Sequence, residues 1–285
     1  MMVRARTVRI ASLATAGLLA TTALTACGGD DGEAEGEPKN AAAEQSPAQV
    51  VQATGEKTEQ AGSARLKLTT TAVTDGRSES VSGSGVIDLR NGTSEVRLGM
   101  KGEELEQRVV DRVLYQKPPE GSGQLPKGKS WTKVDLGKLQ SSGAMGNTQV
   151  SNPADSLAYT RSLSEENVEK VGTEKIGGVR TTHYRVDVDL GKLAEGNAEQ
   201  ERKLRQRLGD EVPVDLWIDD EGLMRRQQVS LTVKDASGQG SGRKATVKTV
   251  MNLSGFGTPV DVSAPPAGDT ADMTDELAKA GSGSA

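Results

Sequence analysis

The clearest signal in this chain is an alternation of apolar and polar residues, which is typical of β-strands that bury one face and expose the other. Between residues 64 and 72, for example, Ala64, Leu66 and Leu68 alternate with charged or hydroxyl-bearing residues. The same period of two predicts strands over about 96–100, 182–190, 212–218, 223–233 and 245–253, with weaker candidates at about 81–90, 104–115, 130–136 and 167–173. Short turns between successive strands indicate an antiparallel meander of roughly ten strands.

Three further segments have the signals of helices. Ser46 and Pro47 suit the N-cap and the first position of a helix over about 47–61, and Asn152-Pro153 opens a second by the same logic. The third, about 192–208, is densely charged. Because these helices are few and polar, we expect an α+β fold in which two or three helices cover a curved antiparallel sheet incompletely.

The inner face of this sheet is expected to carry slim side chains, because the domain has only six aromatic residues. Such a face favours an apolar hollow that accepts lipid chains, but slim side chains also pack closely, and the pattern leaves both outcomes open. The candidate cavity residues are Leu66, Leu68, Val96, Leu98, Val186, Val188, Leu216 and Ile218.

The N-terminus has the pattern of a bacterial lipoprotein signal. Three arginines precede an apolar stretch from about Ile10 to Ala23, which is too short to span a bilayer, and Leu24-Thr25-Ala26-Cys27 then forms a lipobox. Residues 1–26 are therefore predicted to be a signal peptide, and Cys27, the only cysteine, the site of lipidation. We expect the mature protein to be anchored through Cys27 at the extracytoplasmic face of the cell membrane.

Composition divides the rest of the chain. Residues 27–46 contain the lipidated cysteine and a flexible acidic spacer, 47–265 form the folded domain, and 266–285 are predicted to be a disordered tail. Loss of the leader removes three arginines and no acids, which changes the formal net charge from −5 to −8. This acidic balance argues against a nucleic-acid partner.

The sequence lacks the parts of a catalytic or metal site. The only histidine, His183, is predicted to lie on a polar strand face as a surface or cross-strand hydrogen-bonding residue, and there is no Gly-x-Ser-x-Gly nucleophile motif. A Ser/His/Asp set assembled from distant positions stays open. One histidine and no free thiol argue against a metal site, and we expect no cofactor and no enzymatic activity.

Three local segments each allow two interpretations. Asp219-Asp220-Glu221-Gly222 would bind calcium weakly or form a hairpin turn, and turn chemistry is favoured. Gly83-Ser84-Gly85 indicates a strand irregularity rather than a phosphate loop. The Gly- and Ser-rich segment 137–151 is either a lid over a cavity or a loop, and its few apolar residues favour the loop.

Several motifs together carry a family resemblance over most of residues 47–265. They are Ser46-Pro47-Ala48-Gln49-Val50-Val51 after an acidic spacer, Ser130-Trp131-Thr132-Lys133-Val134, Asn152-Pro153, the run 168–179 ahead of Thr182-His183-Tyr184-Arg185, and Pro213-Val214-Asp215-Leu216-Trp217-Ile218-Asp219. This order resembles actinobacterial lipoproteins of the LppX/LprA/LprF/LprG group. The resemblance implies a LolA-like half-barrel with an apolar cavity, and a role in carrying lipids or lipoglycans across the envelope.

Two functional hypotheses follow. In the first, the protein binds or carries lipid or lipoglycan acyl chains in an apolar cavity, without catalysis. In the second, the core is filled and the domain is an envelope scaffold or a partner of a membrane sensor. The outer strand face, with Trp217 as a candidate contact, would then bind an envelope protein.

Overall fold

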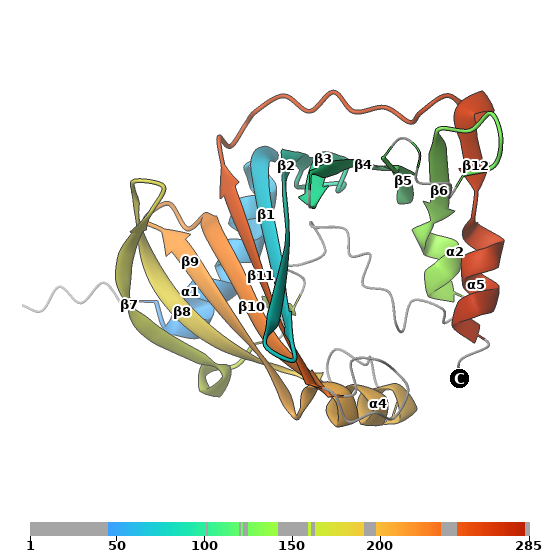
Figure 1. The fold of residues 1–285 in the computed structure, drawn as a ribbon. Coiled ribbons are helices and arrows are strands. Elements are labelled where there is room, and N and C mark those ends of the chain that lie inside the picture. The colour runs from blue at the N-terminus through green and yellow to red at the C-terminus, as the bar shows by residue number, and fades with distance from the viewer. Residues whose placement is uncertain are drawn as a thin grey trace, which may run out of the picture. The chain divides into compact units, whose positions relative to one another are not determined.

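A computed structural model of the chain describes residues 45–100, 102–119, 121, 125–141, 159–160, 163–190, 198–234 and 244–282. All of them belong to one compact unit, Glu44–Ala285. They form a sheet of 12 strands in the order β12-β6-β5-β4-β3-β2-β1-β11-β10-β9-β8-β7 (Figure 1). Neighbouring strands are antiparallel except β6 and β12, which are parallel. The predicted fold class, a curved antiparallel sheet with helices, is confirmed.

The strands are β1 (Ser63–Thr74), β2 (Arg77–Asp88), β3 (Ser94–Met100), β4 (Glu103–Val110), β5 (Val113–Lys117), β6 (Trp131–Asp135), β7 (Val168–Ile176), β8 (Val179–Asp189), β9 (Glu211–Asp219), β10 (Met224–Lys234), β11 (Lys244–Ser254) and β12 (Thr270–Asp272). The helices are α1 (Pro47–Gln60), α2 (Leu136–Ser141), α4 (Ala198–Leu208) and α5 (Thr274–Ser282), with short 3₁₀ helices η3 (Glu165–Asn167) and η4 (Ala267–Asp269). Among the described residues, no helix combines the length and the hydrophobicity needed to cross a membrane.

Each predicted strand segment contains a strand, and two strands were not foreseen. The segment 104–115 holds both β4 and β5, because Asp111 and Arg112 form a tight turn with φ of 50° and 61°. Two successive positive φ values are the geometry of a type I′ hairpin, which glycine or asparagine usually occupies. The turn lacks that sequence signal, so alternation alone merges the two strands.

Two glycines allow the sheet to bend between β2 and β3. A Cβ atom at Gly85 would overlap the carbonyl oxygen of Glu95, and one at Gly83 would lie 2.5 Å from Leu98 Cδ2. The pairing register between the two strands is nevertheless unbroken. The strand irregularity predicted at Gly83-Ser84-Gly85 is therefore not a break in the pairing of β2 with β3. Gly83 and Gly85 are positions where β3 lies so close to β2 that an added side chain would overlap Glu95 or Leu98.

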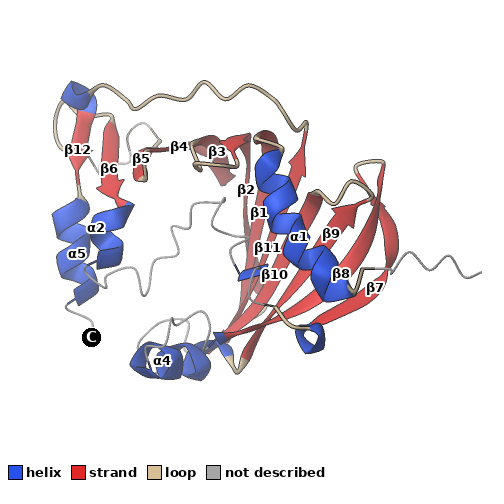
Figure 2. Cartoon of the chain, turned by 180° about the vertical axis from the view of Figure 1, so that it is seen from behind, coloured by secondary structure: helices blue, strands red, loops and turns tan. Residues whose placement is uncertain are grey.

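Helix α1 lies on one side of the sheet, which we call the inner face (Figure 2). It begins as predicted: the Ser46 side chain accepts a hydrogen bond from the Gln49 backbone, and the Gln49 side chain accepts one from the Ser46 backbone. This capping box satisfies two free N–H groups of the first turn. The helix buries Ala48, Val51, Thr54 and Thr58 against the sheet.

The other predicted helices are seen only in part. Helix α4 lies within the predicted segment 192–208. The helix predicted from Asn152-Pro153, with Leu157, Tyr159 and Leu163 on it, begins outside the described residues, and only 159–160 and 163 of its span are described. The segment 137–151, predicted to be a loop, begins with α2 instead. Its remaining residues, from 142, lie outside the described part. Helix α2 forms because Leu136 and Leu139 have a core to pack against.

The prediction of a disordered tail at 266–285 is wrong for residues 267–282, which contain η4, β12 and α5. Thr274 joins this segment to β6, since its hydroxyl accepts a hydrogen bond from the Asp135 backbone at 3.0 Å. Met273 and Ala278 pack against buried residues of β4, β5, β6 and α2. The composition of the segment is mainly polar, and only a few of its side chains take part in this packing. Composition alone therefore predicts disorder.

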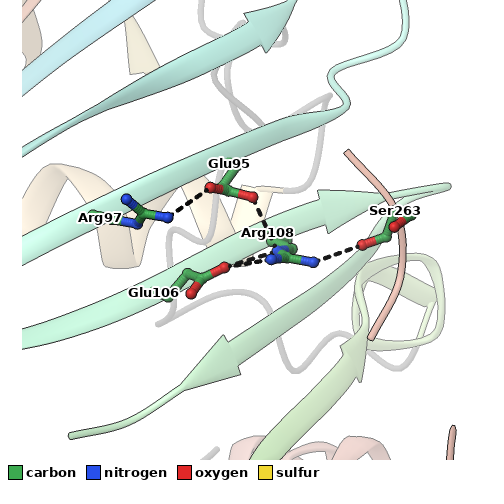
Figure 3. A network of polar contacts seen from close by, with 5 residues as sticks. All are labelled: Glu95, Arg97, Glu106, Arg108 and Ser263. Atoms are coloured by element: carbon green, nitrogen blue, oxygen red, sulfur yellow. Dashed lines mark hydrogen bonds and ion pairs between the residues drawn. The ribbon is translucent and has the colours of Figure 1, made fainter. Parts of the chain in front are cut away.

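The connecting segment, residues 255–266, joins β11 to this C-terminal part. It is bonded to β1 through Gly257 N, which donates to Ser63 O at 2.9 Å. It is also bonded to β4 through Arg108 Nη1, which donates to Ser263 O at 3.1 Å. Figure 3 shows that Arg108 additionally pairs with Glu95 at 3.2 Å and with Glu106 at 2.6 Å. This ion network lies on the outer face and ties the connecting segment to β3 and β4.

Candidate functional site

The inner face of the sheet carries two hydrophobic clusters. The larger one joins α1 to β1, β2, β3 and the strands from β7 to β11. The smaller one lies between β4, β5 and β6 and the helices α2 and α5, and its buried residues are Val109, Leu114, Val134, Leu136 and Leu139. The larger cluster contains every cavity residue that the sequence predicted.

Those eight residues are not equally buried. Six of them are buried in the larger cluster: Leu66, Val96, Val186, Val188, Leu216 and Ile218. Leu68 and Leu98 are only partly buried and pack at the margin of the cluster. The structure therefore brings the predicted residues together on one face, and their role in binding a lipid stays a prediction.

Four partly buried residues form an apolar margin that we call the half-buried stripe: Leu68, Leu98, Val229 and Leu231. The period of two over 223–233 places Val229 and Leu231 on the inward face, but neither is among the eight candidate cavity residues. The signal that could have found them was already present, because they continue the alternation of β10. A strict period of two through Val229 and Leu231 would also bury Leu223. In β10 a bulge between Met224 and Arg226 shifts this alternation, so the buried residue at the start of the strand is Met224.

A single row of paired residues crosses the inner face from β8 to β3. In order it is Tyr184, Leu216, Gln227, Met251, Leu68, Gly83 and Leu98. Gly83 has no side chain, so the Leu98 side chain lies over it. The row is thus continuous from the buried core to the half-buried stripe, with Gln227 as an amide among apolar neighbours.

Helix α1 is held over this face by specific bonds at both ends. Near its C-terminal end, Thr58 Oγ1 accepts a hydrogen bond from Met224 N at 3.0 Å. Gln52 Nε2, in the first half of the helix, donates to Leu163 O at 2.6 Å. The buried hydroxyl of Thr54 donates to Val50 O within the helix. These hydrogen bonds satisfy buried polar groups and fix the position of α1 against the inner face of the sheet.

Two tyrosines belong to the same cluster. Burial raises the pKa of the Tyr159 phenol above its ordinary value. Burial also raises the pKa of Tyr184, and a hydrogen bond with Thr182 partly opposes that shift. Both phenols therefore stay neutral at physiological pH, which suits an apolar face.

On the outer face, His183 takes part in a cross-strand cluster, as predicted. Its Nε2 lies 2.9 Å from Asp215 Oδ1, and the Arg185 guanidinium reaches the same oxygen at 3.2 Å. The His183 ring stacks on Trp217 with 4.3 Å between ring centroids. No serine is bonded to His183 among the described residues, so this arrangement does not provide a nucleophile for a Ser/His/Asp set.

Trp217 lies on the outer face, as alternation predicted, but its side chain is covered. His183 stacks on one side, and the Arg226 guanidinium lies 5.5 Å from the ring centroid. The indole Nε1 donates to Glu174 Oε1 at 2.5 Å, and the residue is 6% exposed. The interpretation of Trp217 as an accessible partner contact is therefore wrong.

The acidic turn after β9 is explained by hydrogen bonding within the turn. Asp219 Oδ1 accepts bonds from Glu221 N at 3.0 Å and Leu223 N at 2.9 Å, and Asp219 Oδ2 pairs with Arg225 at 2.5 Å. Gly222 supplies the positive φ of 84° that the turn requires. The carboxylate of Asp219 is thus used by the turn, which confirms the turn interpretation.

A hollow of about 410 Å³ lies along α4, away from the predicted cavity residues. Ala198, Glu201, Arg202, Arg205 and Gln206 line it. Arg205 is already bonded to Glu201 at 2.9 Å and to Asp210 at 3.2 Å, and these bonds raise its pKa. Because the hollow is charged, it does not suit an acyl chain, and the inner face is the better candidate site.

The family model of the LppX_LprAFG lipoproteins matches residues 46–262. A putative lipoprotein of Streptomyces coelicolor is 26% identical over 250 residues, which are 82% of this chain and 76% of that protein.

Two solved structures are also similar. Lipoprotein LppX of Mycobacterium tuberculosis has a TM-score of 0.45 and 17% identity, with 75% of this chain and 98% of that chain covered. LprF of Mycobacterium bovis has a TM-score of 0.40 and 16% identity, with 78% and 99% covered. Because the family model spans most of the chain, this protein belongs to the LppX_LprAFG lipoprotein family.

Proposed function

We propose that this protein is a membrane-anchored lipoprotein that binds the acyl chains of a lipid or lipoglycan on the inner face and carries them at the cell envelope. The half-buried stripe is the observation that carries this proposal. Its four side chains continue a buried core yet keep part of their surface accessible. An acyl chain laid along them would gain about 25 cal/mol for each Å² of apolar surface removed from water.

The anchor in this proposal is Cys27, which lies outside the described residues. Membership of a lipoprotein family and the lipobox pattern both support it. Buried acyl chains contribute about 0.8 kcal/mol per methylene, so a diacylglyceryl group on Cys27 is a stable tether. It would keep the inner face within reach of the extracytoplasmic leaflet.

Binding and release of a lipid need no chemical reaction, and we propose no enzymatic activity. The polar side chains near His183 are used by ion pairs and stacking on the outer face. The inner face instead offers apolar side chains and neutral phenols. This division fits a carrier that shields acyl chains from water.

The test is mass spectrometry of lipids extracted from the purified chain beginning at residue 28, produced in a host with membranes. We expect about one lipid per protein, because the stripe would be filled when lipid is available. A clean extract would contradict the proposal and favour the alternative, a non-catalytic scaffold with a filled core.

A matched pair of variants makes this test specific to the inner face. Leu231→Asp places a charge in the half-buried stripe, whereas Thr232→Asp places the same charge on the exposed neighbouring position. We expect co-purifying lipid to fall at least tenfold only in Leu231→Asp, because a buried carboxylate strongly disfavours an acyl chain. Thermal unfolding of both variants checks that each is folded. Equal lipid content in the two folded variants would argue against the stripe as the site.

A further inference from the structure

One side chain in the inner-face row has a polar atom that the fold does not use. Gln227 is 9% exposed, and among the described residues its Oε1 has no hydrogen-bond partner. Its cross-strand neighbours are Leu216 and Met251, both buried and apolar. An acceptor left without a donor in such surroundings is costly, so its retention calls for an explanation.

Two hydroxyls lie on the same face one row away. Thr249 is two residues along β11 from Met251, the partner of Gln227, and it pairs with Thr70 of β1. The hydroxyls of Thr70 and Thr249 are 3.1 Å apart and share one hydrogen bond. Two hydroxyls have two hydrogens, and only one of them is used in that bond. The pair therefore retains a donor one row away from the unused acceptor of Gln227.

The half-buried stripe surrounds this polar group. Leu68 is in the row of Gln227, and Val229 is two residues further along the same face of β10. Across β11, Leu231 pairs with Val247, which pairs with Ala72 of β1. A chain lying on the stripe would thus have apolar contacts on either side of Gln227 and the threonine pair.

We propose that Gln227, together with Thr70 and Thr249, binds a hydroxyl group of the lipid, so that the site prefers hydroxyl-bearing acyl lipids to plain ones. This inference rests on the proposed function. A hydroxyl is suited to the site because it donates to Gln227 Oε1 and accepts from the threonine pair at the same time. The hydroxyl would belong either to a hydroxylated acyl chain or to the glycerol of a diacylglycerol.

Competition binding tests the preference. The full mature chain with Cys27→Ser is loaded with a fluorescent fatty acid, which is then displaced by stearate or 12-hydroxystearate, and by trioleoylglycerol or dioleoylglycerol in detergent. We expect about three- to tenfold tighter binding of the hydroxylated member of one pair, as for one buried hydrogen bond. Preference in the first pair assigns the hydroxyl to the chain, and preference in the second assigns it to the glycerol. No preference in either pair overturns the inference.

The variant Gln227→Leu and its neighbour Gln228→Leu provide the matched control. Gln228 belongs to the opposite face, where its amide reaches Asp215 at 3.5 Å. We expect Gln227→Leu to abolish the preference for the hydroxylated lipid over the plain one, and Gln228→Leu to keep it. Gln227→Met, which is unbranched and flexible, serves if leucine does not fit. A preference that survives in both Gln227 variants overturns the inference.

The outcomes also separate this inference from the proposed function. Equal binding of plain and hydroxylated lipids leaves the carrier intact and removes the role of Gln227. Absence of binding for all four lipids removes both. Thermal unfolding without lipid gives an independent readout, because replacing an unused buried acceptor with an apolar side chain should not lower the Tm. A large fall in Tm would show that the fold itself uses the Gln227 amide, which contradicts the inference.

Discussion

At the scale of single residues, the packing of the strands depends on positions without a side chain and on polar side chains that form hydrogen bonds between elements. Gly85 has no Cβ where Glu95 of β3 lies close to β2, and the Thr274 hydroxyl connects β6 to α5. His183 and Asp215 form a pair on the outer face that the period of two correctly placed there. The same period could not reveal that Trp217 is covered, because the covering residues come from β8 and β10.

Gly85→Ala should destabilise the protein, because the added Cβ would overlap the carbonyl oxygen of Glu95. Overpacking of this kind costs about 1–3 kcal/mol of unfolding free energy. The measurement is chemical denaturation of the chain beginning at residue 28. Gly99→Ala is the matched control in the adjacent strand, since its nearest neighbour, Ser82 O, lies 3.8 Å from the new Cβ. Equal stability of the two variants would show that β3 can move away from β2.

Asp272 should make stability depend on pH in the acid range. Hydrogen bonds from Thr274, with a smaller contribution from Lys133, lower the pKa of Asp272 to about 2 from an ordinary 3.8. A lowered pKa stabilises the fold above about pH 4, and this contribution is lost as the pH falls towards 2. Asp272→Asn should therefore be less stable at pH 7 and should lose less stability than wild type between pH 4 and 2.

Urea denaturation at pH 7, 4 and 2 measures the effect of Asp272→Asn. The effect should be small, because the Asp272 side chain is half exposed. Asp261→Asn, an exposed acid in the connecting segment, is the control and should follow wild type. An identical pH dependence in all three proteins would argue against the role of the Thr274 bonds.

At the scale of elements, local sequence patterns predict some helices and strands well and others poorly. Helix α1 was predicted within one residue, because Ser46, Pro47 and Gln49 form a cap that depends only on neighbours in sequence. The strands β4 and β5 were merged, because Asp111 and Arg112 adopt positive φ without glycine. Helix α5 was missed, because its segment is mainly polar and small and its packing partners are far away in sequence.

Ending the chain after Pro266 tests the role of β12 and α5. This removes Met273 and Ala278 from the smaller cluster and exposes Leu136 and Leu139. Loss of about 2 kcal/mol of burial should lower the Tm by roughly 4–8 °C and increase binding of a hydrophobic dye. A chain ending at Ser282 is the control and should unfold like wild type. An unchanged Tm after the larger deletion would mean that the C-terminal elements are dispensable for the fold.

At the scale of the whole molecule, the sheet has one apolar face and one polar face, and the proposed anchor at Cys27 would keep that sheet at a membrane. The connecting segment is bonded to β1 through Ser63 at one end and to β4 through Arg108 at the other. The inner face is continuous from β1 to β3, since the pairing register passes from β1 through Gly83 to Leu98. A lipid carrier needs these two properties together, an apolar face and proximity to its source of lipid.

Cys27→Ser should release the protein from the membrane. The thiol is the only group in the chain that can accept a diacylglyceryl group by the lipobox reaction, because Cys27 is the only cysteine. We expect incorporation of labelled palmitate to be lost and the protein to move from the membrane fraction to the soluble fraction. Thr25→Ser retains a small residue in the lipobox and should behave like wild type. Membrane retention of Cys27→Ser would refute the anchor.

The sequence by itself determined the strand segments, the start of α1 and the set of side chains that shares the inner face, because periodicity and capping are local properties of the backbone. It also contains the lipobox pattern that makes Cys27 a candidate anchor. Tertiary structure decided which of those side chains are fully buried, where the sheet bends over Gly83 and Gly85, and that the polar C-terminus folds against β6. It also decided that Gln227 lies in an apolar row and that its Oε1 is not bonded to any described residue. These properties depend on neighbours brought together from distant parts of the chain, and no local pattern records them.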